Sequence, residues 1–158
     1  MAMQKAMFGA GCFWHVQAEF DKAKGVAKTT CGYSGGHTKN PTYEDVCTDK
    51  TGHAETVLVE FDPKVVSYEK LLDVFFEMHD PTTVNRQGPD VGTQYRSVIF
   101  YTSPWQKKVA EKAVAELDKS GKLSKPIATK IEKAGKFYPA EEYHQKYYVK
   151  NGLVSCRI

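Results

Sequence analysis

Residues 5–22 of this 158-residue chain read KAMFGAGCFWHVQAEFDK, and they set the order of the elements that follow. The apolar run that ends at Gly9 predicts a strand, and a tight Gly-Ala-Gly turn comes directly after it. Val16 and Phe20 then follow Cys12 at four-residue intervals, which is the spacing of one face of a helix. We therefore predict a strand, a turn, and a helix that has Cys12 in its first turn.

The position of Cys12 has a chemical consequence. A helix N-terminus carries partial positive charge and N–H groups without partners, and both favour a thiolate over a thiol. We therefore expect the pKa of Cys12 to lie below the ~8.5 of a free thiol. The alternative is that Cys12 is a small buried apolar side chain, as most free cysteines are.

The composition is that of one globular domain over residues 1–158. Hydrophobic residues make up 41% of the chain and charged residues 26%, which are ordinary values for a soluble protein. The net charge is +3, but Lys and Arg are spread without a basic block, so nucleic-acid binding has little support. The N-terminus lacks the apolar run of a signal peptide, and no stretch reaches membrane-spanning length. We expect a cytoplasmic monomer that binds neither nucleic acid nor membranes.

The four cysteines form no C-x-x-C pair; they are Cys12, Cys31, Cys47 and Cys156. Their spacing argues against a zinc ribbon and against a thioredoxin-type redox motif. A disulfide scaffold is not expected in a chain of this length and apolar content. The histidines and Glu55 could in principle bind a metal, but their spacings match no ligand motif.

The rest of the chain alternates short apolar runs with loops. Strands are predicted over residues 5–9, 26–33, 53–61, 95–101 and about 127–131, and helices over residues 12–22, 67–79, 103–120 and 139–152. The first six elements are strand, helix, strand, strand, helix and strand, which is the order of the ferredoxin-like βαββαβ plait. We predict an α+β protein built on this plait, with additional C-terminal helices, a short strand and a coil tail over residues 150–158.

Two long loops interrupt this pattern. The first, over residues 34–52, contains Tyr43 and Cys47, and a loop of this length inside a compact domain is more often functional than idle. The second, over residues 82–94, is polar and contains Asp90.

Glu55 lies in a strand whose alternation puts it on one face with Val57, Val59 and Phe61. A carboxyl group among apolar side chains has its charged form disfavoured, so we expect the pKa of Glu55 to be raised. The alternative is that Glu55 lies at the hydrated start of the strand.

A thiolate at Cys12 and a protonated Glu55 would together attack an electrophile and give a proton to the group that becomes negative. The hydroxyl groups of Tyr43 and Tyr95 could donate hydrogen bonds to a polar oxygen. Phe13 and its neighbour Trp14 could form an apolar pocket beside the sulfur, although aromatic side chains on a helix are more often core residues.

Two other functions remain open on these residues. In the first, His53, His79 or His144 pairs with Cys12 as the base of an acyl-transferase or hydrolase, assisted by an acid such as Asp80. In the second, the chain is a non-catalytic module whose aromatic pocket binds oxidised or Met-rich peptides.

Nearly the whole chain resembles the A-type peptide methionine sulfoxide reductases. Each matching motif is short, but many in the same order make a specific resemblance. The motifs are GCFW (11–14), GYSGG (32–36), NPTY (40–43), TGHAE (51–55), HDPT (79–82), NRQGPD (85–90), QYRS (94–97), FYPAE (137–141) and YHQ (143–145). Such enzymes reverse the oxidation of methionine to its sulfoxide.

The resemblance implies roles for the matching residues. Cys12 would attack the sulfur of the sulfoxide, and Glu55 would protonate its oxygen. Tyr43 and Tyr95 would hydrogen-bond that oxygen, with Asp90 on the polar side of the pocket. The substrate would be methionine-S-sulfoxide, either free or in oxidised proteins, and no cofactor would be bound.

The resemblance also implies a pocket for the substrate methyl group, formed by Phe13 and Trp14. Cys12 would become a sulfenic acid, condense with a second cysteine to a disulfide, and be recycled by thioredoxin, or by dithiothreitol in vitro. We expect Cys156 to be the resolving cysteine, because a tail can reach a site that a strand cysteine cannot. Cys47 is the second candidate, although we favour a packing role for it, and Cys31 is expected to be structural.

Three features depart from the family pattern. His15 stands where the family usually has glycine, and Gln17 where it often has glutamate. Both lie near Cys12 on the predicted helix. The tail has one cysteine, where some relatives have two.

Overall fold

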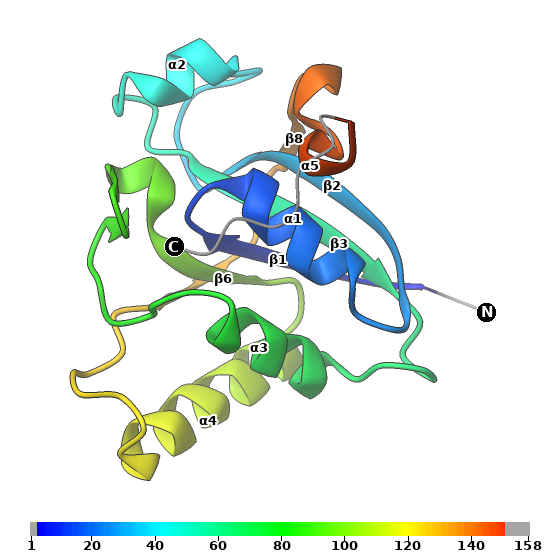
Figure 1. The fold of residues 1–158 in the computed structure, drawn as a ribbon, viewed down its shortest axis with the longest axis vertical. Helices are drawn as coiled ribbons and strands as arrows, with labels where there is room; N and C mark the ends of the chain where they lie inside the picture. Colours follow the sequence, from blue (N-terminus) through cyan, green and yellow to red (C-terminus); the bar gives the residue numbers. More distant parts are fainter. Residues whose placement is uncertain (1–2, 151–158) are drawn as a thin grey trace.

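The computed structural model describes residues 3–150 and has a mixed α+β fold around a central sheet (Figure 1). The strands are β1 (Gln4–Ala10), β2 (Val26–Ser34), β3 (Ala54–Phe61), β4 (Arg86–Gln87), β5 (Asp90–Val91), β6 (Ser97–Tyr101), β7 (Lys130–Lys133) and β8 (Tyr138–Pro139). The helices are α1 (Phe13–Asp21), α2 (Tyr43–Cys47), α3 (Tyr68–Glu77), α4 (Pro104–Ser120) and α5 (Tyr147–Lys150), with 3-10 turns at Thr93–Tyr95 and Glu142–His144.

The central sheet has the strand order β7-β6-β1-β3-β2-β8. All its pairs are antiparallel except β6 with β7, and β4 and β5 form a separate hairpin. Helices α1 and α3 pack together on one face of the sheet, and α4 lies beside α3, β6 and β7 (Figure 1). The predicted α+β class is therefore confirmed, with a sheet that is mostly antiparallel.

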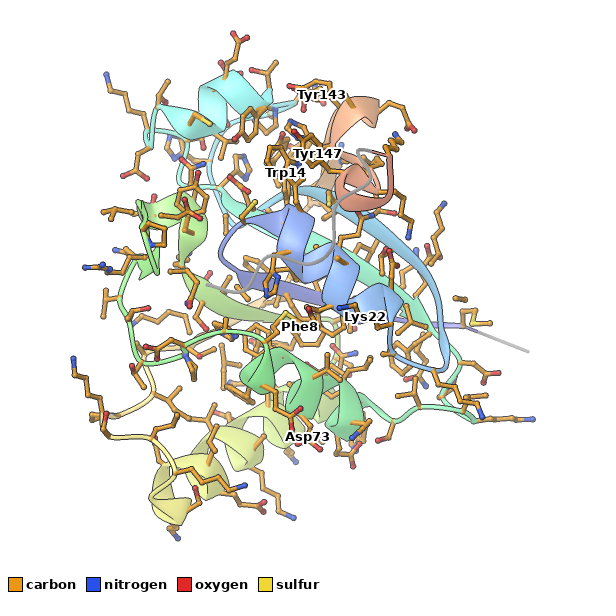
Figure 2. The ribbon with its side chains drawn as sticks, in the orientation of Figure 1. Phe8, Trp14, Lys22, Asp73, Tyr143 and Tyr147 are labelled. Carbon is orange, nitrogen blue, oxygen red and sulfur yellow. The ribbon has the colours of Figure 1, made fainter. Side chains whose placement is uncertain are left out.

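The main core fills the space between the sheet and helices α1 and α3. Phe8 of β1 lies at its centre, with its ring 5.0 Å from that of Phe20 on α1 and 5.2 Å from that of Phe75 on α3 (Figure 2). These side chains are fully buried. Replacing Phe8 with Ala would therefore cost about 3–5 kcal/mol of stability, because it removes buried apolar area and leaves a cavity.

Local sequence signals account for the two long helices. Ser67 precedes α3, and its hydroxyl accepts a hydrogen bond from the backbone N–H of Lys70. Ser103 does the same before α4, where Pro104 occupies the first helical position, and left-handed Gly121 follows the helix end. These predictions are confirmed, although α3 ends two residues before the predicted end.

Both predicted loops contain short elements that the pattern did not reveal. Helix α2 lies in the first loop, where Thr42 and Asp45 form reciprocal side chain-to-backbone hydrogen bonds. The second loop contains the β4–β5 hairpin and a 3-10 turn. The predicted strand near residues 127–131 is present as β7, displaced toward the C-terminus.

The prediction of one final helix over residues 139–152 is wrong. Strand β8 pairs with β2, a 3-10 turn follows, and α5 begins only after Lys146, whose φ of 56° is left-handed. The side chain of Gln145 accepts a hydrogen bond from the Cys31 N–H at 2.8 Å and donates one to the Cys31 carbonyl at 2.9 Å. This pairing with the edge of β2 holds the segment in a non-helical path, so tertiary contacts override helix propensity.

Within residues 3–150, no helix combines the length and apolar character that a membrane-spanning helix needs. The coil tail over residues 150–158, including Cys156, lies outside the described residues except for Lys150.

Candidate active site

The turn between β1 and α1 carries Cys12. Gly11 has a φ of 93°, and a Cβ added there would lie 2.9 Å from the side chain of Gln87, so only glycine fits. Cys12 is the N-cap of α1 rather than a residue of its first turn. Its carbonyl accepts the first helical hydrogen bonds, from the N–H groups of His15 at 3.2 Å and Val16 at 3.3 Å.

The expectation of a lowered pKa for Cys12 is wrong for the site without substrate. Burial first, and the negative charge of Glu55 second, raise the pKa of Cys12 to about 12. The N–H groups of Trp14 and His15 act in the expected direction and lower the pKa. The helix N-terminus therefore stabilises the thiolate, but the loss of hydration outweighs it. Cys12 starts as a neutral thiol.

Glu55 lies at the start of β3 and is 2% exposed. Its Oε1 accepts the N–H of Phe13 at 3.2 Å, and its Oε2 accepts the side-chain amide of Gln94 at 2.8 Å. Burial raises the pKa of Glu55 to about 7, with the charge of Asp90 adding to it, while these two hydrogen bonds oppose the rise. The predicted burial and the predicted direction of the pKa are confirmed. A carboxyl group with this pKa can hold a proton at neutral pH.

Three further predicted residues surround these two. Burial and then the charge of Glu55 raise the pKa of both the Tyr43 and the Tyr95 hydroxyl groups well above the ordinary range. The charge of Asp90 raises the pKa of Cys12, of Glu55 and of Tyr95. The structure thus brings these five residues close enough for their charges to interact, although they come from the turn before α1 and from α2, β3, β5 and a 3-10 turn.

Phe13 and Trp14 lie differently. Phe13 is fully buried and packs 5.1 Å from the His144 ring, measured between ring centroids. Trp14 is half-buried, stacks on Tyr147 with a centroid distance of 3.7 Å, and donates a hydrogen bond from Nε1 to Nδ1 of His144 at 2.9 Å. Figure 2 shows Trp14 at the start of α1, next to Tyr147 and Tyr143 of the C-terminal segment. Phe13 and Trp14, which we call the aromatic wall, therefore both contact His144 of the C-terminal segment.

Gln94 and Glu141 were not singled out from the sequence. Gln94 is 4% exposed and donates to Glu55, and Glu141 accepts the Tyr33 hydroxyl at 2.9 Å and the Tyr43 N–H at 3.0 Å. A polar residue in a polar loop carries no periodic signal of burial, so only the family motifs point to these positions.

The described cysteines differ in exposure. Cys31 is fully buried in β2, as expected of a structural cysteine, and its thiol donates to Gln17 Oε1 at 3.2 Å. Cys47 ends α2 and is exposed, so the packing role favoured for it is wrong. The amide of Gln94 lies 3.7 Å from Cys47 Sγ. Cys47 therefore lies next to the residue that binds Glu55.

The histidines proposed as bases are engaged elsewhere. His53 accepts the N–H of Gly36 and contacts the Thr38 carbonyl, so it fixes a loop. His79 is hydrogen-bonded to the Phe75 carbonyl and to Ser97, and burial lowers its pKa to about 4. His144 binds Trp14. In the described part of the chain, no histidine ring is hydrogen-bonded to the Cys12 thiol, and no cluster of three His, Cys, Asp or Glu side chains is placed to hold a metal ion.

The profile of the family described as peptide methionine sulfoxide reductase matches residues 4–158. The chain belongs to this family. It is 60% identical over 155 residues to the peptide methionine sulfoxide reductase MsrA of Methanothermobacter thermautotrophicus, a match covering 98% of this chain and 92% of that protein.

Solved structures extend the comparison to the fold. Reduced Mxr1 from Saccharomyces cerevisiae superposes with a TM-score of 0.92 at 36% identity, covering 99% of this chain and 90% of that one. The complex of Mxr1 with Trx2 matches with a TM-score of 0.65 at 27% identity, covering 92% of this chain and 85% of that one.

The structure places His15 and Gln17, two buried polar residues of α1, as follows. Gln17 is 1% exposed, and its Oε1 accepts the Cys31 thiol and the Lys146 N–H, the latter at 2.7 Å. Its amide donates to the Thr29 carbonyl, so a neutral side chain connects α1, β2 and the C-terminal segment. His15 is also buried and donates from Nε2 to the Met78 carbonyl, facing α3.

Proposed function

We propose that this protein reduces methionine-S-sulfoxide, free or within oxidised proteins, to methionine and is returned to its reduced state by thioredoxin. One observation carries the proposal: Glu55 is a buried acid with a pKa of about 7, and its charge acts on the Cys12 thiol. The family and the solved complex of Mxr1 with Trx2 support the substrate and the reductant.

The first step requires a nucleophile and an acid, because a sulfoxide oxygen is a poor leaving group unless it is protonated. Cys12 Sγ attacks the sulfoxide sulfur while Glu55 gives its proton to the oxygen. The thiol proton passes to the Glu55 carboxylate, so the acid is restored. In sum, a thiol and a sulfoxide become a sulfenic acid and a thioether, since the oxygen moves from the methionine sulfur to Cys12.

The surrounding residues orient the substrate. Tyr43 and Tyr95 donate hydrogen bonds to the oxygen as charge develops on it, and their raised pKa values keep both hydroxyl groups protonated. Asp90 lies on the polar side, and Phe13 and Trp14 contact the methyl group.

A second cysteine completes the cycle. Its thiol condenses with the sulfenic acid, so that a disulfide forms and water leaves. Thioredoxin then reduces this disulfide by exchange and is itself oxidised, and dithiothreitol replaces it in vitro. We assign the second thiol to Cys156. The exposed Cys47 is the alternative, because Gln94 connects its sulfur to Glu55.

The test of the reaction is a steady-state assay of each sulfoxide epimer with dithiothreitol. The S epimer should be reduced, the R epimer should not, and Cys12→Ser should abolish turnover. Trapping of a thioester instead of a sulfenic acid would favour an acyl-transferase, and absence of turnover with both epimers would favour a binding module.

The test of the second thiol compares Cys156→Ser with its matched control Cys47→Ser. With thioredoxin, Cys156→Ser should release about one methionine per enzyme and then stop, whereas Cys47→Ser should keep turning over. The reverse result would transfer the assignment to Cys47.

We also infer a finer description of the fold and its setting. The four strands β6-β1-β3-β2, with α1 and α3 as crossovers, would form a βαββαβ plait inside one catalytic domain; the strand order supports this. The protein would act as a cytoplasmic monomer, which size-exclusion chromatography with light scattering would test.

A further inference from the structure

The indole of Trp14 contacts two residues of the C-terminal segment, and Figure 2 shows one of them, Tyr147, beside it. Its Nε1–H donates to His144 Nδ1 at 2.9 Å, and its face stacks on Tyr147 at 3.7 Å with an interplanar angle of 6°. The hydrogen bond fixes the direction of the ring, whereas the stack alone would let the ring turn within its plane.

The hydrogen bond also fixes the state of His144. Because Nδ1 accepts the hydrogen bond from the indole N–H, it carries no proton itself, so a neutral ring has its proton on Nε2. His144 is 1% exposed, and its Nε2 is buried without a hydrogen-bond partner. Burial lowers the pKa of His144, which keeps the ring neutral near pH 7, while the charge of Glu141 opposes this.

The groups that face His144 are mostly aromatic. The Tyr43 ring of α2 lies 4.4 Å away, Tyr143 of its own segment lies 4.1 Å away, and Phe13 of α1 lies 5.1 Å away, between ring centroids. Tyr147 stacks on Trp14, and Glu141 is the charged group that acts on His144. Among residues 3–150, no cationic side chain is hydrogen-bonded to the His144 ring. A protonated His144 would therefore have one carboxylate near it, that of Glu141, and aromatic rings around it.

We propose that His144 is a positioning residue: its unprotonated Nδ1 orients Trp14 in the wall that receives the substrate methyl group, and protonation of His144 releases Trp14 and weakens substrate binding. This rests on the proposed function, because the wall is a substrate site only if a sulfoxide binds there. The effect falls on binding, since His144 touches neither Cys12 nor Glu55 through a hydrogen bond.

Two substitutions separate the acceptor from the ring. His144→Asn places an amide oxygen near the position of Nδ1, so it restores the acceptor without a group that titrates. His144→Phe keeps a flat ring and removes the acceptor. We expect His144→Phe to raise KM about 3- to 10-fold, the range that corresponds to one lost hydrogen bond, with little change in kcat. We expect His144→Asn to keep KM near the parent value.

The pH dependence gives a readout that a merely structural role would not move. In the parent protein, KM should rise as pH falls below the ordinary pKa of histidine, because His144 gains a proton; in His144→Asn this rise should be absent. The chain has two tryptophans, so Trp105→Phe, on the half-exposed start of α4, leaves Trp14 as the only indole. In the Trp105→Phe protein, the fluorescence of Trp14 should change with pH in the same acid range. This change should be absent when His144→Asn is added.

Three results would overturn the inference: a KM in His144→Asn that is as high as in His144→Phe, an acid fluorescence transition that survives His144→Asn, or a parent KM that does not change with pH. If His144→Phe does not fold, the pH dependence of the Asn variant decides alone. The fluorescence titration needs no turnover, so failure of the proposed function would appear separately, as absent reduction of the sulfoxide.

Discussion

Glu55 and Glu141 are two carboxylates that both act on Tyr43, and their surroundings move their pKa values in opposite directions. Glu55 is buried under α1, and burial raises its pKa to about 7. Glu141 is more open to water, and although partial burial raises its pKa, hydrogen bonds from Tyr43 and Tyr33 bring the net pKa below the usual range. The difference teaches that the same side chain becomes a proton donor in one place and a permanent anion that fixes loops in the other.

Neutralising each carboxylate in turn should have very different effects on the reaction. Glu55→Gln should slow the single-turnover reduction step by about 10²-fold or more, because the proton donor is lost. Glu141→Gln should slow it by no more than about threefold, since Glu141 acts only through hydrogen bonds to its neighbours. Rapid-quench measurement of methionine release checks both, and equal losses in the two variants would contradict the assignment.

The reactivity of the Cys12 thiol should respond to Glu55 but not to Glu141, because the charge of Glu55 is the second cause of the raised pKa of Cys12. Alkylation of Cys12 by iodoacetamide at pH 8 should be at least about 100-fold slower than that of a free thiol with a pKa of ~8.5. Glu55→Gln should speed it and Glu141→Gln should not. Peptide mass spectrometry must follow Cys12 separately, because Cys47 is exposed. A Cys12 as reactive as free cysteine would show that burial does not control this thiol.

Stability should depend on pH in opposite ways at the two carboxylates. The folded pKa of Glu55 is raised from 4.5 to about 7, so its contribution is most favourable at low pH and is lost as pH rises through about 7. From pH 4 to pH 8, the wild type should lose about 3 kcal/mol relative to Glu55→Gln in urea unfolding. A constant difference between the two proteins over this range would contradict the raised pKa.

The smallest effect belongs to Glu141. Its folded pKa is lowered, so its contribution is present above the unfolded pKa and is lost as pH falls through the folded pKa, in the acid range. At pH 7, Tyr33→Phe should cost about 1 kcal/mol, because one hydrogen bond to this carboxylate disappears. In Glu141→Ala, which has no side-chain oxygen to accept that bond, Tyr33→Phe should cost nothing further, and a double-mutant cycle measures this coupling.

The sequence predicted what local patterns encode. Alternation put Glu55 on the face that α1 covers, and Ser67 and Ser103 cap the helices as their positions indicate. The thiol of Cys12 was misjudged, because the helix N-terminus is visible in sequence but the burial that outweighs it is produced by distant segments. The prediction of a final helix was wrong for a related reason, because the hydrogen-bond partner of Gln145 is the backbone of Cys31, which is 114 residues away.

The site was predictable only in part for the same physical reason. Cys12 lies in a strand-turn-helix and Glu55 lies in an alternating strand. Local patterns therefore predict the position of Cys12 near a helix N-terminus and the burial of Glu55. Gln94, Glu141 and the bond between His144 and Trp14 join loops to elements far along the chain, and no local rule fixes such contacts.

The proposed reaction depends on Glu55 holding a proton at neutral pH. Carbon-13 NMR titration of the side-chain carboxyl carbons, in protein labelled at glutamate and assigned by comparison with Glu55→Gln, measures this directly. The Glu55 resonance should shift with a midpoint near pH 7, whereas the Glu141 resonance should shift below the usual range of a glutamate. A Glu55 resonance that completes its titration below pH 5 would show that Glu55 is ionised at neutral pH and would contradict the proposed reaction.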